Sequence, residues 1–270
     1  MNSEAPHDGW IKIGEGASAQ VWALDATRVV KLFEPDVNEV PIALEYEAGR
    51  WADALGLPVG RPIGRVVLNM RSGILFERRD GPDMLSFIMR HPHRMWKSIW
   101  RLARLHARVH QSPGSAALPR QRNVLRHRIL RSHAGPEAVQ AALDQLDRLD
   151  DDDRLAHGDF HPANILMSSD GPAIVDWAQA SSGSPAADAA RTELLLRFGG
   201  RGAGAASALT AVVTARWYRR CYLRFSGVDQ AEFDAWRLPV AVAWHRGQLE
   251  GNGARIDRWI GALISELRRR

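Results

Sequence analysis

The residues best suited to chemistry lie in one short segment, His157–Asn164, which reads His-Gly-Asp-Phe-His-Pro-Ala-Asn. Asp159 and Asn164 are five positions apart, and Asp176 follows Asn164 by twelve. Phosphoryl transfer needs a carboxylate to accept the proton of the attacking hydroxyl, and an amide oxygen and a second carboxylate to hold Mg²⁺ against the phosphates. Taken alone, Asp159 could be a turn residue, Asn164 a helix cap and Asp176 an aspartate at the end of a strand. Their combination around apolar strands favours phosphoryl transfer.

A second signal is the Gly-rich segment Ile13–Val21, which reads Ile-Gly-Glu-Gly-Ala-Ser-Ala-Gln-Val. A Gly-rich turn between two strands lets backbone N–H groups approach phosphate oxygens without interference from side chains. Compared with the kinase pattern G-x-G-x-x-G-x-V, Ala19 replaces the third glycine. An ordinary β-turn is the alternative, so this segment supports the phosphoryl-transfer hypothesis only together with its neighbours.

Lys31 lies ten residues after Val21, within the apolar run Val29-Val30-Lys31-Leu32. The chain has only three lysines. Because side chains alternate along a strand, we expect Val30 and Leu32 to point into a core, away from Lys31. An outward-facing strand residue is the alternative. A lysine that contacts phosphates and pairs with a helix glutamate is the functional interpretation.

The glutamate partner of Lys31 should lie on the helix predicted over residues 41–55. Glu45 and Glu47 are both available there. They are two positions apart, so they face different directions and only one can turn toward Lys31. We predict Glu47 as the partner.

The order of these parts resembles the aminoglycoside phosphotransferase and choline kinase family, small-molecule kinases with a protein-kinase-like fold. Gly158 before the aspartate and His161 after it, in place of the protein-kinase His-Arg-Asp, are specific to this group. The resemblance spans Gly9 to about Glu193 and is carried by Ile13–Val21, Val30–Leu32, Glu47-Ala48, Leu57–Val59, Leu75–Arg78, Leu102–Ala107, His157–Leu166 and Val175–Trp177.

The resemblance implies roles for individual residues. Asp159 would be the catalytic base, and Asn164 and Asp176 would be the Mg²⁺ ligands. Asp188 would support the catalytic loop, and the backbone of Glu77 to Arg79 would bind adenine. The candidate ATP-binding residues are Gly14, Gly16, Ser18, Lys31, Glu47, Glu77 and Arg79.

The composition is that of a folded, soluble protein. Of 270 residues, 45% are hydrophobic and 25% are charged, and ten tryptophans can help to fill a core, which excludes a disordered chain. Cys221 is the single cysteine and cannot form an internal disulfide, so a reducing cytoplasm is expected. No apolar run reaches the roughly 18 residues of a membrane span. The net charge is +5, but the arginine cluster 216–224 carries no accepted nucleic-acid motif. Neither nucleic acid nor a membrane is therefore an expected partner.

The elements that must position these residues indicate an α+β, bilobal, protein-kinase-like fold. A small β-rich lobe is expected over residues 1–79, with an Arg71–Gly73 hairpin turn, and a larger, mainly helical lobe over residues 80–270. The tryptophans of the C-terminal helices are interpreted as packing core rather than as an aromatic cage. The strands expected are 10–13, 20–24, 29–33, 65–69, 73–77, 164–167 and 173–175, and the helices are 41–55, 93–110, 121–133, 137–149 and several from residue 189 onward.

These observations predict transfer of the γ-phosphate of ATP, with Mg²⁺, to a hydroxyl of a small molecule. A non-catalytic nucleotide-binding relative is the alternative. A protein kinase is less favoured, because only 11 residues separate Asp176 from Asp188 and leave no room for a long activation loop. The last helices carry more arginine than Asp plus Glu, which weighs against a polycationic aminoglycoside acceptor. Choline, a sugar, an amino alcohol, a macrolide or another metabolite remain open as acceptors.

Overall fold

A computed structural model describes residues 9–16, 18–199, 205–245 and 253–269. The chain divides into two compact units, of which the first comprises Met1–Arg90 and Ala163–Ala180 and the second His91–Pro162 and Ser181–Arg270. The expected division between residues 79 and 80 does not coincide with this one. The segment that carries Asn164 and Asp176 groups with the N-terminal residues, because the backbone N–H groups of Met167 and Ile174 donate to the carbonyls of Pro82 and Pro58.

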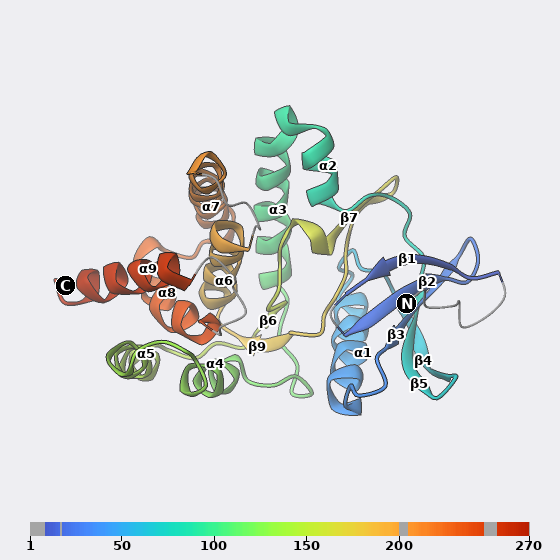
Figure 1. The fold of residues 1–270 in the computed structure, drawn as a ribbon, viewed down its shortest axis with the longest axis horizontal. Helices are drawn as coiled ribbons and strands as arrows, with labels where there is room; N and C mark the ends of the chain where they lie inside the picture. The colour runs from blue at the N-terminus through green and yellow to red at the C-terminus, as the bar shows by residue number, and fades with distance from the viewer. Residues whose placement is uncertain (1–8, 17, 200–204, 246–252, 270) are drawn as a thin grey trace. The chain divides into compact units, whose positions relative to one another are not determined.

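The first unit is built on a five-stranded antiparallel sheet with the strand order β1-β2-β3-β5-β4, shown in blue to cyan in Figure 1. Helix α1 packs against β4 and β5. The chain then forms the short helix α2 and, after its passage through the second unit, a hairpin of β7 and β8. The bounds are β1 Ile11–Glu15, β2 Ala19–Ala23, β3 Arg28–Phe33, α1 Glu39–Ala54, β4 Pro62–Leu68, β5 Arg71–Glu77, α2 Met84–Arg90, β7 Ile165–Ser168 and β8 Gly171–Ile174, with the 3-10 turn η2 Pro162–Asn164 before β7.

Apolar side chains fill both faces of this sheet, in two separate clusters. Val30 and Leu32 are fully buried in one cluster together with Trp22. The other cluster joins Phe33 to Ile42 of α1. Lys31 lies on the α1 face, where its Nζ is 5.3 Å from the centre of the Phe33 ring. The expectation that Val30 and Leu32 point away from Lys31 into a core is confirmed.

The turn between β4 and β5 lies earlier than the sequence suggested. Asn69 and Met70 have φ values of 47° and 61°, as a two-residue hairpin loop with left-handed backbone requires. The expected turn residues Arg71–Gly73 instead begin β5. Gly73 serves a close approach between strands, because a Cβ there would lie 2.8 Å from a Leu32 methyl carbon and 3.0 Å from the Lys31 carbonyl oxygen.

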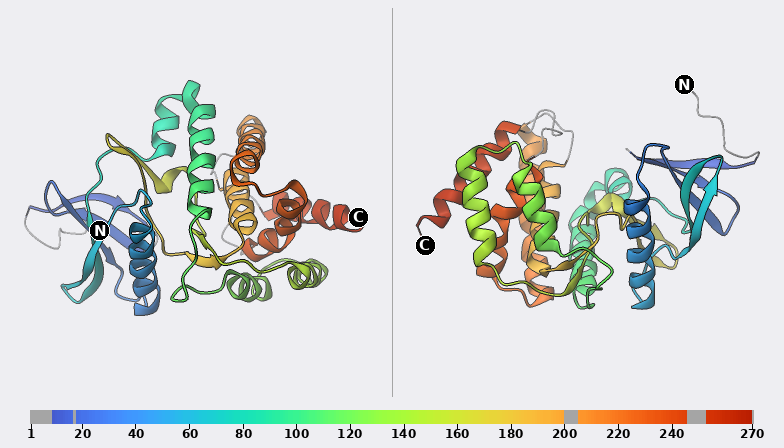
Figure 2. Two further views of the ribbon diagram at one scale, coloured as in Figure 1. Left: turned by 180° about the vertical axis from the view of Figure 1, so that it is seen from behind. Right: turned by 90° about the horizontal axis from the view of Figure 1, so that it is seen from below.

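The second unit is mainly helical. Helix α3 packs against α7, α6 contacts both α7 and α8, and α8 also contacts α4, α5 and α9. The green helices α4 and α5 lie side by side in Figure 2, as their contacts require. The bounds are η1 Pro92–Arg94, α3 Met95–His110, α4 Gln121–Leu130, α5 Pro136–Arg148, β6 Arg154–Ala156, β9 Ser181–Gly183, α6 Pro185–Phe198, α7 Ala205–Ser226, α8 Gln230–Trp244 and α9 Gly253–Leu267.

A short antiparallel pair, β6 with β9, is the part of the second unit that brings distant sequence together. It places the start of the His157–Asn164 segment beside the chain that leads into α6. These three-residue strands were not predicted, because they are too short for a period-two pattern to show. Within the described residues, no helix is both long and apolar enough to cross a bilayer.

Candidate functional site

In the first unit, Lys31 lies between two carboxylates. Its Nζ donates to Glu45 Oε1 at 2.7 Å and Oε2 at 2.9 Å, and to Asp176 Oδ1 at 3.1 Å. The Glu45 side chain is 2% exposed, whereas that of Asp176 is 43% exposed. One ammonium therefore joins β3, α1 and the chain after β8, and the cluster keeps an open carboxylate.

The predicted partner Glu47 is wrong, since Glu45 makes the ion pair. The buried face of α1 contains Ile42, Glu45, Ala48 and Ala52, which recur at helical spacing, and Glu47 is exposed on another face. This apolar stripe was readable in the sequence and is in phase with Glu45. The choice between the two glutamates could therefore have been made from the helix period.

Burial and charge act in opposite directions within this cluster. Burial would lower the pKa of Lys31, but the negative charges of Glu45 and Asp176 outweigh it and raise that pKa. Burial raises the pKa of Glu45, and the attraction of Lys31 compensates this only in part, because Asp176 adds a second negative charge. The lysine remains charged, and two carboxylates compete for it.

The two candidate metal ligands lie next to each other on the β7–β8 hairpin. Asn164 precedes β7 and Asp176 follows β8, and the Val175 N–H donates to the Asn164 carbonyl at 3.0 Å. Asp176 has a φ of 64°, a left-handed conformation that a non-glycine residue rarely adopts. One neutral and one anionic oxygen donor on adjoining backbone fit the ligand preference of Mg²⁺. The residues present therefore suit the metal that the sequence predicts.

The Gly-rich turn joins β1 and β2. Gly14 pairs with Val21 in the ladder, and the Gly16 N–H donates to the Ala19 carbonyl at 2.8 Å. Gly16 therefore uses its N–H to close the turn, and Ser18 is exposed at the tip of the turn. Ala17, also in this turn, lies outside the described residues.

The segment 77–79 follows the end of β5. The N–H groups of Glu77 and Arg78 donate to the carbonyls of Arg61 and Thr27, both at 2.8 Å. Within the described residues, the Arg79 N–H has no backbone partner. Of the three N–H groups expected to meet adenine, that of Arg79 is the one left available.

In the second unit, Asp159 lies among cationic and potentially cationic groups. Arg191 Nη2 is 3.3 Å from Asp159 Oδ1, and His161 Nε2 is 3.4 Å from Asp159 Oδ2. Burial would raise the pKa of Asp159, but the hydrogen bond from His161 and the charges of Arg191, His161 and His157 hold it at about 2. The group is a carboxylate at neutral pH, as a proton acceptor must be.

Asp188 holds the loop that carries Asp159. Its Oδ2 accepts the His157 N–H at 2.7 Å, and its Oδ1 accepts the Gly158 N–H at 2.9 Å. Ser184 caps α6 by accepting the Ala186 N–H, which fixes the turn on which Asp188 lies. The supporting role expected of Asp188 is confirmed.

Two histidines of α3 complete the surroundings of Asp188. The Nε2 atoms of His106 and His110 lie 3.1 Å and 3.2 Å from Asp188 Oδ2, and their Nδ1 atoms lie 2.6 Å and 2.7 Å from the hydroxyls of Tyr218 and Tyr222. All three ligand-type side chains are buried. Each ring nitrogen already has a hydrogen-bond partner, so the trio is a closed polar network. The i, i+4 spacing of the two histidines on one helix was a signal that the sequence analysis did not use.

Arg191 was also missed. It lies three positions after Asp188 on α6, so the two side chains share one side of the helix. Because Asp188 was already expected at the catalytic loop, that spacing could have drawn attention to Arg191. His157 is fully buried, and its Nδ1 accepts the Asp159 N–H at 3.2 Å.

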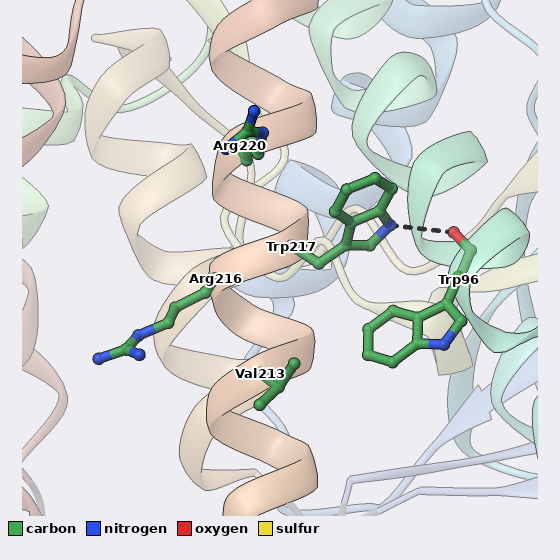
Figure 3. Close-up of a pocket in the computed structure, with 5 residues that line it drawn as sticks. All are labelled: Trp96, Val213, Arg216, Trp217 and Arg220. Carbon is green, nitrogen blue, oxygen red and sulfur yellow. Dashed lines mark hydrogen bonds between the residues drawn. The ribbon is translucent and has the colours of Figure 1, made fainter.

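A groove of about 470 Å³ lies elsewhere in the second unit, between α3 and α7, and is lined by Trp96, Val213, Arg216, Trp217 and Arg220. Figure 3 shows the Trp217 indole pointing toward Trp96, whose carbonyl oxygen accepts the indole N–H at 3.1 Å. Arg216 points away from the two indoles in that view. Of the C-terminal tryptophans, Trp236 and Trp259 belong to the core as predicted, whereas Trp217 and Trp244 are only half-buried.

Solved structures share this fold. The chain matches a ternary complex of a thermostable mutant of aminoglycoside phosphotransferase APH(4)-Ia with AMP-PNP and hygromycin B at 14% identity and a TM-score of 0.62, covering 97% of this chain and 93% of that one. It matches the aminoglycoside phosphotransferase APH(3'')-Id of Streptomyces rimosus at 16% identity and a TM-score of 0.62, covering 87% of this chain and 93% of that one. It matches a choline/ethanolamine kinase family protein of Mesorhizobium loti at 14% identity and a TM-score of 0.61, covering 97% of this chain and 90% of that one.

These likenesses confirm the protein-kinase-like α+β fold. No curated protein sequence matches the chain. The family model described as "Phosphotransferase enzyme family" matches residues 9–222, which is most of the chain and includes every residue of both clusters described above. The chain therefore belongs to the phosphotransferase enzyme family.

Proposed function

We propose that the protein transfers the γ-phosphate of ATP to a hydroxyl group of a small molecule. The observation that carries this proposal is the ionised carboxylate of Asp159, held on a loop whose N–H groups are fixed by Asp188. Such a carboxylate can accept the proton of an attacking hydroxyl, and a fixed loop keeps it in one orientation. The complex of a similar structure with AMP-PNP and hygromycin B supports ATP and a small hydroxylated acceptor as the substrate classes.

Lys31, Asn164 and Asp176 have the chemistry to handle the nucleotide. Lys31 would neutralise phosphate oxygens while Glu45 fixes its position. Asn164 and Asp176 would hold Mg²⁺, which supplies positive charge against the phosphates. The exposed Asp176 carboxylate can serve a metal ion while its Oδ1 stays beside Lys31.

The test is an ADP-release assay of the purified protein over a panel of hydroxylated metabolites and antibiotics, followed by comparison of variants on the best acceptor. Asp159→Asn should lower turnover by about 10²–10⁴-fold and leave Mg²⁺-ATP affinity nearly unchanged, because the base acts on the acceptor. Asp152→Asn, an exposed carboxylate on a loop of the same unit, is the matched control. Wild-type turnover in a folded Asp159→Asn protein would contradict the assignment.

The metal ligands need a separate measurement. Asn164→Ala and Asp176→Ala should weaken ATP binding in the presence of Mg²⁺ more than in its absence, because their contribution depends on the metal. Calorimetric titration with and without Mg²⁺ measures both affinities. Equal losses in the two conditions would mean that the residues have a structural role only.

A further inference from the structure

Arg191 binds the catalytic loop and the proposed base with one guanidinium. Its Nε donates to the Gly158 carbonyl at 2.6 Å, and its Nη2 lies 3.3 Å from Asp159 Oδ1. Only 15% of the side chain is exposed, so solvent screens the contact weakly. Helix α6 thus holds the loop twice, with the Asp188 carboxylate on the Gly158 N–H and with Arg191 on the Gly158 carbonyl.

The groups that most favour the ionised form of Asp159 are histidines and an arginine. They are His157 and His161 of its own loop and Arg191 of α6, with Asp188 turned toward the two loop N–H groups. An acceptor whose hydroxyl reaches Asp159 therefore comes close to the Arg191 guanidinium.

Two further carboxylates of α6 and α8 are already paired with arginine. Glu193 is fully buried and accepts from Arg237 Nε at 3.1 Å. Asp234 lies 3.5 Å from Arg219 Nη1 and 3.3 Å from Arg237 Nη1. A polyamine would need free carboxylates to replace the water around its ammonium groups. Glu193 and Asp234 do not meet this need, because each is paired with arginine.

We propose that Arg191 positions Asp159 and selects the acceptor by charge, so that the protein phosphorylates a neutral or anionic hydroxylated small molecule, such as a polyol or a sugar acid, and rejects polyamines and quaternary ammonium alcohols. This inference rests on the proposed phosphotransfer. A cationic substituent beside the attacking hydroxyl is repelled by the fixed guanidinium, and an anionic or neutral one is not. Arg191 acts through Asp159 on the reaction and through its charge on the substrate.

The first experiment compares small hydroxylated acceptors that carry different charges. The wild-type protein is assayed for ADP release with glucose, glucosamine and glucuronate, and with glycerol, glycerate, ethanolamine and choline, beside an aminoglycoside. The neutral or anionic acceptors should exceed the matched amines in kcat/KM by about tenfold or more. An amine or an aminoglycoside as the best acceptor would overturn the charge selection and leave the proposed phosphotransfer standing. No ADP release with any hydroxylated compound would contradict the proposed phosphotransfer, and the selection with it.

The second experiment tests two substitutions at Arg191 with the best acceptor and with its analogues of different charge. Arg191→Gln removes the charge and should reduce the preference for neutral or anionic acceptors over amines about tenfold. It should also move the acidic limb of the kcat/KM profile to higher pH, because the positive charge that favours ionised Asp159 is gone. Arg191→Lys keeps the charge and loses the two-atom geometry, so kcat should fall while the preference is retained.

The control is Arg197→Gln, which removes an arginine from the same helix. Arg197 lies 5.3 Å from the centre of the Trp259 ring, and its substitution should not change the acceptor preference. Circular dichroism establishes that each variant is folded. An equal loss of kcat/KM for all acceptors in Arg191→Gln, with an unchanged pH profile, would show a structural role and overturn the proposal. Because the wild-type panel tests the charge preference independently, an unfolded variant does not remove the test.

Discussion

The two units each bury a carboxylate, and they stabilise it in different ways. Glu45 of the first unit, 2% exposed, has the Lys31 ammonium as its partner. Asp188 of the second unit, 1% exposed, has no ammonium or guanidinium beside it among the residues that the structure describes, and it accepts hydrogen bonds from two backbone N–H groups and two imidazoles. One carboxylate is balanced by charge, and the other by the number of donors around it.

The pKa values of the two carboxyls move in opposite directions. Burial raises the pKa of Glu45, because Lys31 is shared with Asp176. Burial would also raise the pKa of Asp188, but the interactions with His106 and His110 hold it well below the ordinary value. Hydrogen-bond donors that face a carboxylate can thus lower its pKa by more than burial raises it, whereas one cation shared between two carboxylates does not.

This difference matches what each cluster can do. The Lys31 cluster has one cation, two carboxylates and an exposed side at Asp176, so it can take up a further cation or an anion that competes for Lys31. The Asp188 cluster has all its oxygens and ring nitrogens in hydrogen bonds, and it fixes the loop that carries Asp159. The Lys31 cluster can therefore accommodate a change of charge, whereas the Asp188 cluster holds the loop in one geometry.

The largest expected effect comes from substituting Asp188, the carboxylate that accepts hydrogen bonds from several donors. Asp188→Asn replaces one acceptor oxygen by an N–H₂ group that faces donors, and each buried donor left unsatisfied costs about 1–3 kcal/mol. We expect a loss of at least about 3 kcal/mol in the free energy of unfolding, measured by urea denaturation.

The control for Asp188→Asn is Asp36→Asn, since Asp36 is exposed. Its change should stay within about 0.5 kcal/mol. A loss below about 1 kcal/mol for Asp188→Asn would show that the network does not depend on the carboxylate.

The second effect concerns Glu45, the carboxylate that is balanced by the charge of Lys31. Lys31→Met leaves Glu45 buried without its cation, which destabilises the fold, and Glu45→Gln in the same chain removes the orphaned charge. The double variant should therefore lose less stability than the two single losses added, by about 1–3 kcal/mol.

Glu47 is the internal control for this coupling, because it is exposed on another face of α1. Lys31→Met and Glu47→Gln should be additive within about 0.5 kcal/mol. Coupling to Glu47 in place of Glu45 would contradict the ion pair seen in the structure. The Asp188 network should show no comparable rescue by one substitution, because two of its donors are backbone groups that no substitution removes.

The sequence predicted much of the fold because each element left a local signal. The alternation around Lys31 predicted its strand, and Gly56, with a φ of 70°, marked the end of α1 as expected. Asp159, Asn164, Asp176 and Asp188 were recognised by spacing and by a family resemblance. These features depend on the backbone period and on neighbouring residues, which a single sequence shows.

The remaining features depend on contacts between distant segments. Arg191 reaches Asp159 across 32 positions, and His106 reaches Asp188 across 82. The pairing of β6 with β9 that leads into α6 has no local pattern in three-residue strands. Glu47 was a different kind of error, because the apolar stripe that identifies Glu45 was present in the sequence. Local sequence therefore indicated candidate site residues more readily than it indicated the partners that hold them.

The third expected effect is a pH dependence of stability in the second unit. Burial, followed by the nearby His110, lowers the pKa of His106 from 6.5 to about 3, against the attraction of Asp188. Between these two values the unfolded chain binds a proton that the folded chain does not, so the free energy of unfolding falls as the pH falls. The contribution is fully present above about pH 6.5 and is lost toward pH 3, at about 1.4 kcal/mol per pH unit.

His106→Gln tests this dependence, because an amide N–H₂ can still donate to Asp188 and does not titrate. Urea denaturation at several pH values between about 6.5 and 4 should give a smaller slope for His106→Gln than for the wild-type protein, by about 1.4 kcal/mol per unit. His127→Gln removes a histidine exposed on α4 and should leave the slope unchanged. Equal slopes in the wild-type and His106→Gln proteins would mean that His106 binds its proton in the folded state. The Asp188 network would then be balanced by charge, as the Lys31 cluster is.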